Sequence, residues 1–106
     1  MERVCFTSRV LADRLDEYIE RHQAVWPDMQ AALARAGWGN YSLFLTGDGL
    51  LIGYLETEDF ETARAAMART EVNAAWQAEM AEFFEGDDDQ RPDEGFRRIS
   101  EIFHLD

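Results

Sequence analysis

Residues 41–55, Tyr41-Ser-Leu-Phe-Leu-Thr-Gly-Asp-Gly-Leu-Leu-Ile-Gly-Tyr-Leu55, predict a β-hairpin near the middle of the chain. Gly47-Asp48-Gly49 is the expected turn, because these residue types tolerate the positive φ angles that tight hairpin loops require. Before the turn the apolar residues alternate, with Tyr41, Leu43 and Leu45 on one side and Phe44 on the other. We therefore expect one strand over residues 38–46 and its antiparallel partner over residues 50–56.

The stretch that precedes the hairpin, residues 11–36, predicts helix. Apolar residues recur there at helical steps, which would place them on one side: Leu11, Leu15, Ile19, Met29 and Leu33. Pro27 breaks or kinks a helix unless it opens a new one at its first position, so we expect two helical pieces that meet near Trp26-Pro27. Gly37 is a typical helix stop.

Helix is predicted again after the hairpin, from about residue 58 to 84. Thr70 divides this stretch in two, because its side chain is suited to cap the second piece. Several apolar residues would face inward at helical spacing: Phe60, Ala63, Met67, Val72, Trp76, Met80 and Phe83. Residues 86–92 predict a polar, charged loop. The two ends of the chain predict strands, over residues 2–10 (with Val4, Phe6 and Val10 on one face) and 95–105.

The order strand, helix, strand, strand, helix, strand predicts an α+β protein with the ferredoxin-like split βαβ arrangement. We expect one domain over residues 1–106, with a four-stranded antiparallel sheet and helices on one face. Residues 50–55 are apolar on both sides of the strand, and so is the C-terminus with Ile99, Ile102, Phe103 and Leu105. A sheet with one wet face should alternate cleanly. The uncovered face therefore predicts a homodimer, paired face to face or by strand edges.

Charge and cysteine content narrow the classes of partner. The chain has 106 residues, with 10 basic against 22 acidic residues and a net charge of −12. Nucleic acid and anionic membranes need a cationic surface, so both are excluded as partners, whereas a neutral ligand such as a sugar is not. Cys5 is the only cysteine, and the N-terminus lacks the pattern of a signal peptide. We expect a soluble protein of the reducing cytoplasm.

Tyr18, His22 and Trp26 are the candidate site residues on the first helical stretch. Steps of four residues would align them along one helix stripe, on the side expected to face the core. The imidazole, with an ordinary pKa of about 6.5, is then either a satisfied core group or the wall of a pocket. Tyr41 and Trp76 would lie near His22 on the covered sheet face, and such aromatic company is typical of small-molecule pockets.

Other chemistries lack support in the sequence. No pairing of His22 or His104 with other residues has the spacing of a metal site, and Asp87-Asp88-Asp89 lacks the pattern of a calcium loop. Ser8 and Ser42 have no motif of a nucleophile, and Cys5 in mid-strand is expected to be inert. We expect Trp38 to serve in packing and Tyr54 in structure or dimer contact.

The chain resembles the L-rhamnose mutarotases. The resemblance rests on Tyr18-Ile-Glu-Arg-His22-Gln-Ala-Val-Trp26-Pro27, Gly39-Asn40-Tyr41, Trp76 and Glu101-Ile-Phe-His-Leu105. It implies the dimeric α/β-barrel form of the ferredoxin-like fold, with His22 as the catalytic proton donor. Tyr18, Tyr41 and Trp76 would bind the sugar. The family often has a Trp-Trp pair where this chain has Trp76-Gln77, so we place Gln77 among the expected substrate-binding residues.

The implied reaction interconverts the α and β anomers of L-rhamnose, or of a related 6-deoxy-hexose such as L-fucose. Ring opening needs one acid and one base and neither cofactor nor metal. His22 is expected to be the principal acid/base, and Tyr18 a second proton relay or a hydroxyl anchor. Two alternatives remain on the same fold: a cofactor-free monooxygenase of the antibiotic-biosynthesis type, and a non-catalytic module that binds a small ligand.

Overall fold

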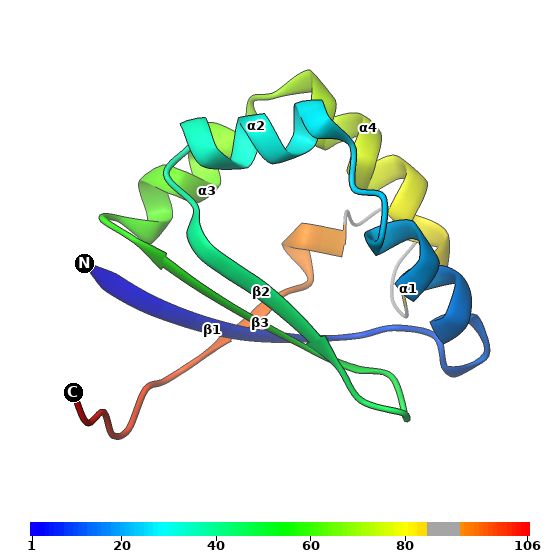
Figure 1. Cartoon of the computed structure of the whole chain (residues 1–106), viewed down its shortest axis with the longest axis horizontal. Helices are drawn as coiled ribbons and strands as arrows, with labels where there is room; N and C mark the ends of the chain where they lie inside the picture. The colour runs from blue at the N-terminus through cyan, green and yellow to red at the C-terminus, as the bar shows by residue number, and fades with distance from the viewer. Residues whose placement is uncertain (85–91) are drawn as a thin grey trace.

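A four-stranded antiparallel sheet forms one layer of the protein, seen edge-on in Figure 1. The computed structural model describes residues 1–84 and 92–106. The strands lie in the order β2-β3-β1-β4, as the ferredoxin-like arrangement requires. Their bounds are β1 Glu2–Arg9, β2 Gly39–Leu45, β3 Leu50–Thr57 and β4 Arg97–Ile99. The predicted hairpin is therefore confirmed, and β1 pairs with the far side of its second strand.

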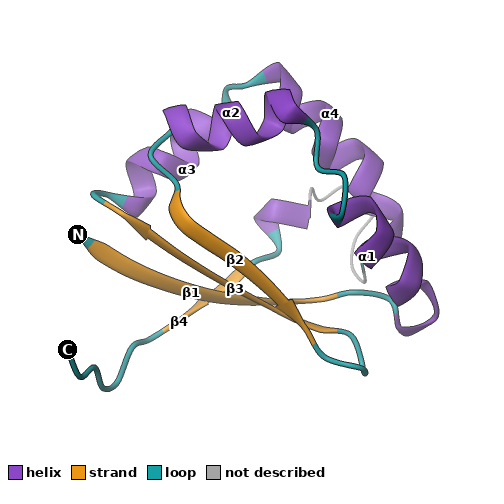
Figure 2. Cartoon of the chain, in the orientation of Figure 1, coloured by secondary structure: helices purple, strands orange, loops and turns teal. Residues whose placement is uncertain are grey.

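The helices form the second layer and arch over one face of the sheet (Figures 1 and 2). This arrangement confirms the α+β prediction. In the part of the chain that the structure describes, no helix is long and apolar enough to cross a membrane. The helix bounds are α1 Leu15–His22, α2 Pro27–Arg35, α3 Phe60–Ala68 and α4 Glu71–Met80, with 3-10 turns η1 Ala12–Arg14, η2 Ala81–Phe83 and η3 Pro92–Glu94.

The helices begin and end where local chemistry predicts. Pro27 is the first residue of α2, where its missing N–H leaves no hydrogen bond unmade. Gly37 follows α2 with φ 93°, the left-handed conformation that glycine adopts without strain. The Thr70 hydroxyl accepts a hydrogen bond from the Asn73 N–H at 3.3 Å and caps α4. Both predicted helix divisions, at Pro27 and at Thr70, are confirmed.

Two glycines let side chains and backbone approach each other closely. Gly49, in the hairpin turn, has φ 99°, and a Cβ there would overlap the Val10 carbonyl. Gly53 lies opposite Phe6 in the β1–β3 register, and a Cβ on Gly53 would overlap the Phe6 ring. The bare backbone at Gly53 therefore allows a large ring to lie flat over the middle of the sheet.

The core between the layers is divided into two clusters. The first joins α1, α2 and α4 to the sheet, and its buried members include Tyr18, Met29, Trp76, Met80 and Phe83. The second lies on the sheet beneath α3 and contains Val4, Phe6, Leu55 and Phe60. Trp38, Leu43 and Phe96 pack against both clusters.

Three sequence predictions are wrong in detail. Ile19 is 45% exposed, because Tyr18 and His22 occupy the inward side of α1. Trp26 is not on α1, which ends at His22, but directly precedes α2. The last strand covers only Arg97–Ile99, not residues 95–105, and the chain from residue 100 onward is coil. Most of the predicted loop at 86–92 lies outside the described residues.

The coil at the C-terminus carries large apolar side chains into solvent. Ile102, Phe103 and Leu105 are 96%, 79% and 80% exposed. Figure 1 shows this coil leaving the sheet beside the N-terminus, away from the helices. None of the described residues buries these side chains, and β4 ends where its pairing with β1 ends.

Candidate active site

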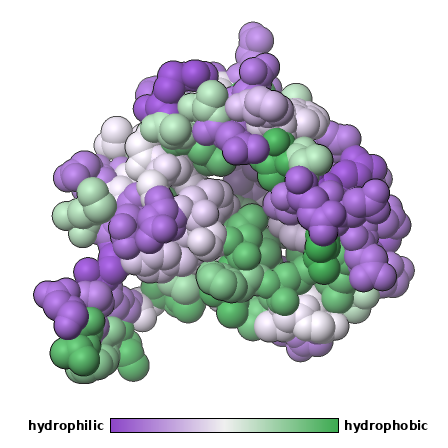
Figure 3. All heavy atoms as spheres, viewed as in Figure 1, coloured by the Kyte–Doolittle hydropathy of each residue, from purple (hydrophilic) through white to green (hydrophobic). Residues whose placement is uncertain are grey.

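A cavity of about 910 Å³ lies between the sheet and the helices, and Figure 3 shows a hollow between the two layers. All five expected site residues belong to its lining: Tyr18, His22, Tyr41, Trp76 and Gln77. Small-molecule pockets commonly enclose roughly 300–1,000 Å³ and combine aromatic walls with a few polar groups. The structure thus places these residues on the wall of a pocket and not in solid packing.

His22, the last residue of α1, is half-buried and has a fixed orientation. Its Nδ1 lies 2.9 Å from the backbone oxygen of Tyr18. Because a carbonyl oxygen only accepts, Nδ1 carries the hydrogen, and in the neutral ring Nε2 carries a lone pair. Burial lowers the pKa of His22 below its ordinary 6.5, although the hydrogen bond to the Tyr18 carbonyl opposes this shift. The imidazole is therefore neutral at pH 7, with Nε2 available as a base.

Aromatic rings surround His22 closely. The Tyr18 ring lies 4.3 Å from the imidazole, centroid to centroid, and Trp76 meets it edge-on at 5.5 Å. Trp26 in turn meets Trp76 edge-on at 5.0 Å, so it reaches the site from the segment that precedes α2. Burial raises the pKa of the Tyr18 hydroxyl well above its usual value. Tyr18 is therefore a protonated hydrogen-bond donor at any ordinary pH.

Tyr41 enters the cavity from the sheet. It follows Asn40, which has φ 45°, and the β2–β3 register shifts between Gly39 and Ser42. A bulge of this kind turns a side chain toward a new direction. Tyr41 meets Trp38 at 5.0 Å. Burial is the main cause that raises the pKa of Tyr41, and the Tyr18 hydroxyl and the Asp93 carboxyl raise it further, which shows that these groups share one electrostatic environment.

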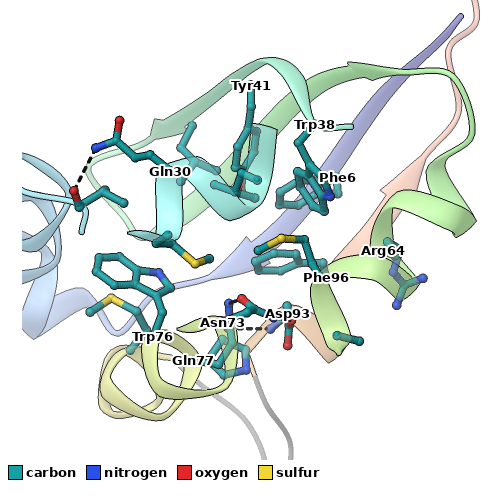
Figure 4. Close-up of a pocket in the computed structure, with 18 of the residues that line it drawn as sticks. Phe6, Gln30, Trp38, Tyr41, Arg64, Asn73, Trp76, Gln77, Asp93 and Phe96 are labelled. Carbon is teal, nitrogen blue, oxygen red and sulfur yellow. Dashed lines mark hydrogen bonds between the residues drawn. The ribbon is translucent and has the colours of Figure 1, made fainter. Parts of the chain in front are cut away.

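Three of the polar side chains in the lining lie together, and two of them, Asn73 and Asp93, were not predicted from the sequence. Asn73 and Gln77 are buried on α4, and Asp93 comes from η3. Figure 4 shows the three together, on the side of the cavity opposite Tyr41. Asn73 and Gln77 are four residues apart on the inward side of α4, a polar pair that the sequence pattern could have revealed. No local pattern marks Asp93.

Trp38 and Tyr54 were expected to have structural roles. Trp38 donates its indole N–H to the Ala63 backbone oxygen at 3.2 Å, which agrees with a packing role, although its ring also lines the cavity. The Tyr54 hydroxyl lies 2.7 Å from a carboxylate oxygen of Glu56. Within residues 1–84 and 92–106, no three His, Cys, Asp or Glu side chains are grouped as metal ligands.

The fold and the cavity define a small α+β protein with an aromatic-walled pocket between sheet and helices, beside one imidazole. Comparison with known families is consistent with this description. The family model described as L-rhamnose mutarotase matches residues 3–105. The chain belongs to the L-rhamnose mutarotase family.

Individual relatives support the same assignment. The chain is 37% identical over 107 residues to an L-rhamnose mutarotase of Oceanobacillus iheyensis, and 38% identical over 107 residues to one of Bacillus subtilis, with 100% of each chain covered. A crystal structure of an L-rhamnose mutarotase from Formosa agariphila matches with a TM-score of 0.82 over 100% of both chains, at 21% identity. That likeness shows the shared fold. The comparisons do not favour the monooxygenase or the non-catalytic module.

Proposed function

We propose that this protein is an L-rhamnose mutarotase that uses His22 as its principal acid/base. The observation that carries the proposal is the position of His22, which lines the cavity while its Nδ1 is bound to the Tyr18 carbonyl. This hydrogen bond fixes the tautomer and leaves Nε2 for chemistry. The full-length similarity to proteins named L-rhamnose mutarotase supplies the reaction and the sugar.

The reaction requires one proton to move between two oxygens on the same carbon. The neutral Nε2 of His22 takes the proton of the anomeric hydroxyl, O1–H, as the C1–O5 bond breaks and C1=O1 forms. The same nitrogen then gives the proton to O5, which becomes the C5 hydroxyl of the open chain. The aldehyde rotates, and the reverse sequence closes the ring on its other face. Acid–base catalysis of this kind contributes roughly a hundred- to ten-thousand-fold.

Tyr18 is a hydroxyl anchor in this proposal and not a second relay. Burial raises the pKa of its hydroxyl, so the phenolate that a relay would leave behind is strongly disfavoured. Trp76 offers its ring to the apolar face of the sugar, and Gln77 on the same helix and Tyr41 on the opposite side of the cavity offer hydrogen bonds. The sugar is uncharged, so the net charge of −12 on the protein does not repel it.

Magnetisation transfer between the anomeric protons tests the proposal. Wild-type protein should accelerate exchange of L-rhamnose anomers more than that of L-fucose. His22→Ala should lose the acceleration and keep the fold, whereas His104→Ala, which changes the exposed histidine outside the cavity, should keep both. Wild-type protein that leaves every sugar at its spontaneous rate would refute the proposed function.

The proposal includes a homodimer. Exposed apolar side chains lie on the sheet and on the C-terminal coil, with Phe44 60% and Ile99 47% exposed beside Ile102, Phe103 and Leu105. A second copy that covers them is the simplest way to remove this area from water. Sedimentation should give twice the chain mass, and Phe103→Glu should shift it toward monomer. Ala78→Glu, exposed on α4, is the matched control; a wild-type monomer would contradict the dimer.

We place the protein in the cytoplasm, with a monosaccharide as its small-molecule partner. The acidic surface repels nucleic acid and anionic lipid, so neither is a partner. A single half-buried cysteine, Cys5, fits a reducing compartment.

A further inference from the structure

Asn73, Gln77 and Asp93 form a closed ring of hydrogen bonds on the cavity wall. The Asn73 amide Nδ2 donates to Asp93 Oδ2 at 3.2 Å, the Asp93 backbone N–H donates to Gln77 Oε1 at 3.2 Å, and Gln77 Nε2 donates to Asn73 Oδ1 at 3.1 Å. Within this ring each of the three residues donates one hydrogen bond and accepts one. The ring fixes the direction of both amides and of the Asp93 carboxyl.

This polar ring borders the proposed reaction centre. Trp76 lies between Asn73 and Gln77 along α4 and contacts the His22 imidazole at 5.5 Å. The negative charge of the Asp93 carboxyl also contributes to the raised pKa of the Tyr41 hydroxyl, after burial as the main cause. Figure 4 shows the same arrangement, with Asp93 and Asn73 on one side of the cavity and Tyr41 on the other. A pyranose with C1 at His22 would present its other hydroxyls between these walls.

Burying these polar side chains costs free energy that apolar side chains would not cost. Asn73 is only 2% exposed and Gln77 8%, and buried amides need hydrogen-bond partners that apolar side chains would not need. Buried polar groups that converge on a pocket commonly fix the orientation of its ligand. A carboxylate oxygen can accept more than one hydrogen bond, so Asp93 Oδ2 can accept from a sugar hydroxyl as well as from Asn73.

We propose that Asp93, held by Asn73 and Gln77, binds a hydroxyl group of the sugar and so selects among sugars by hydroxyl configuration. This inference rests on the proposed mutarotase function. Asp93 then acts in binding and not in proton transfer, and Asn73 is a positioning residue that acts through Asp93.

The test measures KM and kcat for L-rhamnose by anomeric magnetisation transfer, with the affinity for the sugar measured by calorimetry. Asp93→Ala should raise KM by roughly ten- to a hundred-fold, the effect of losing a hydrogen bond to a charged group. The kcat value and its pH profile should stay as in the wild type. Asp93→Asn, which keeps the shape of the side chain, should also raise KM. Asp16→Asn, which changes an exposed carboxylate on α1, should leave KM unchanged.

Deoxy analogues of L-rhamnose, each lacking one hydroxyl, provide a second measurement, which is made on the wild type and on Asp93→Asn. Removal of a hydroxyl that Asp93 binds should weaken affinity for the wild type, and it should weaken affinity no further in Asp93→Asn. Equal affinity of the wild type for every analogue would overturn the inference.

The outcomes separate the two proposals. If the wild type exchanges the anomers and Asp93→Ala has an unchanged KM, this inference alone is overturned. The hydrogen-bonded ring of Asn73, Gln77 and Asp93 would then serve only to support η3. A fall in kcat with an altered pH profile would also overturn it, because Asp93 would then transfer protons. Wild-type protein that neither exchanges nor binds L-rhamnose would overturn both proposals.

Discussion

The cavity wall has one polar region at His22 and another at Asp93, and their side chains are oriented in different ways. His22 is oriented by its own helix, through a carbonyl four residues earlier in the chain. Asp93 is oriented by side chains 16 and 20 residues away, on a different element. The local contact fixes a tautomer, which is what proton transfer requires. The long-range contacts fix a position relative to the opposite wall, which is what recognition of a sugar requires. The comparison predicts that the His22 region controls kcat and the Asp93 region controls KM.

The largest expected effect is that of His22→Gln. The glutamine amide can still form hydrogen bonds, but it cannot take or give a proton near neutral pH. We expect kcat to fall by roughly a hundred- to ten-thousand-fold with KM within a few-fold of the wild type. Gln23→Ala, an exposed neighbour after α1, should leave kcat unchanged. A large rise in KM with little change in kcat would contradict the assignment of kcat to the His22 region.

Asn73→Ala should affect the other region. Loss of the amide frees the Asp93 carboxyl to rotate, so KM should rise by roughly three- to thirty-fold while kcat holds. Thermal unfolding should also shift down, because Gln77 loses a buried partner at 3.1 Å. Glu71→Ala, exposed in the first turn of α4, is the matched control for the helix. A kcat effect as large as that of His22→Gln would erase the difference between the two regions.

Tyr18→Phe should give the smallest of these effects. An anchor contributes one neutral hydrogen bond, so kcat/KM should fall by roughly two- to twelve-fold. The ring contact with His22 at 4.3 Å is kept, and unfolding should change little. If the loss matches that of His22→Gln, Tyr18 is a second proton relay and the single-nitrogen mechanism is wrong.

Sequence patterns predicted those parts of the molecule that neighbouring residues determine. The Gly47-Asp48-Gly49 turn, the Thr70 cap and the start of α2 at Pro27 depend on contacts within a few residues. For the same reason the spacing of Tyr18 and His22 predicted their contact.

The features that were missed depend on distant parts of the chain. Asp93 joins the cavity only because η3 returns to α4, and Ile19 is exposed because the cavity takes the Tyr18 side of α1. The length of β4 was mispredicted for the same reason. The apolar pattern at 102–105 predicts burial but does not say against which surface, and no surface within residues 1–84 and 92–106 covers these side chains.

The central claim is that neutral His22, with Nδ1–H bound to the Tyr18 carbonyl, moves the proton. Burial lowers the pKa of His22, so its imidazole is neutral above pH 6.5. Protonation of the buried imidazole destabilises the fold, so the contribution of neutral His22 to the free energy of unfolding is full above pH 6.5 and is lost as pH falls through the lowered pKa.

Nitrogen NMR of His22 across pH, with anomeric exchange measured on the same sample, tests this directly. The account predicts an Nδ1–H tautomer, a pKa below 6.5, and an exchange rate that falls about tenfold per pH unit below that same pKa. An Nε2–H tautomer, or full activity at a pH where His22 is already protonated, would contradict it.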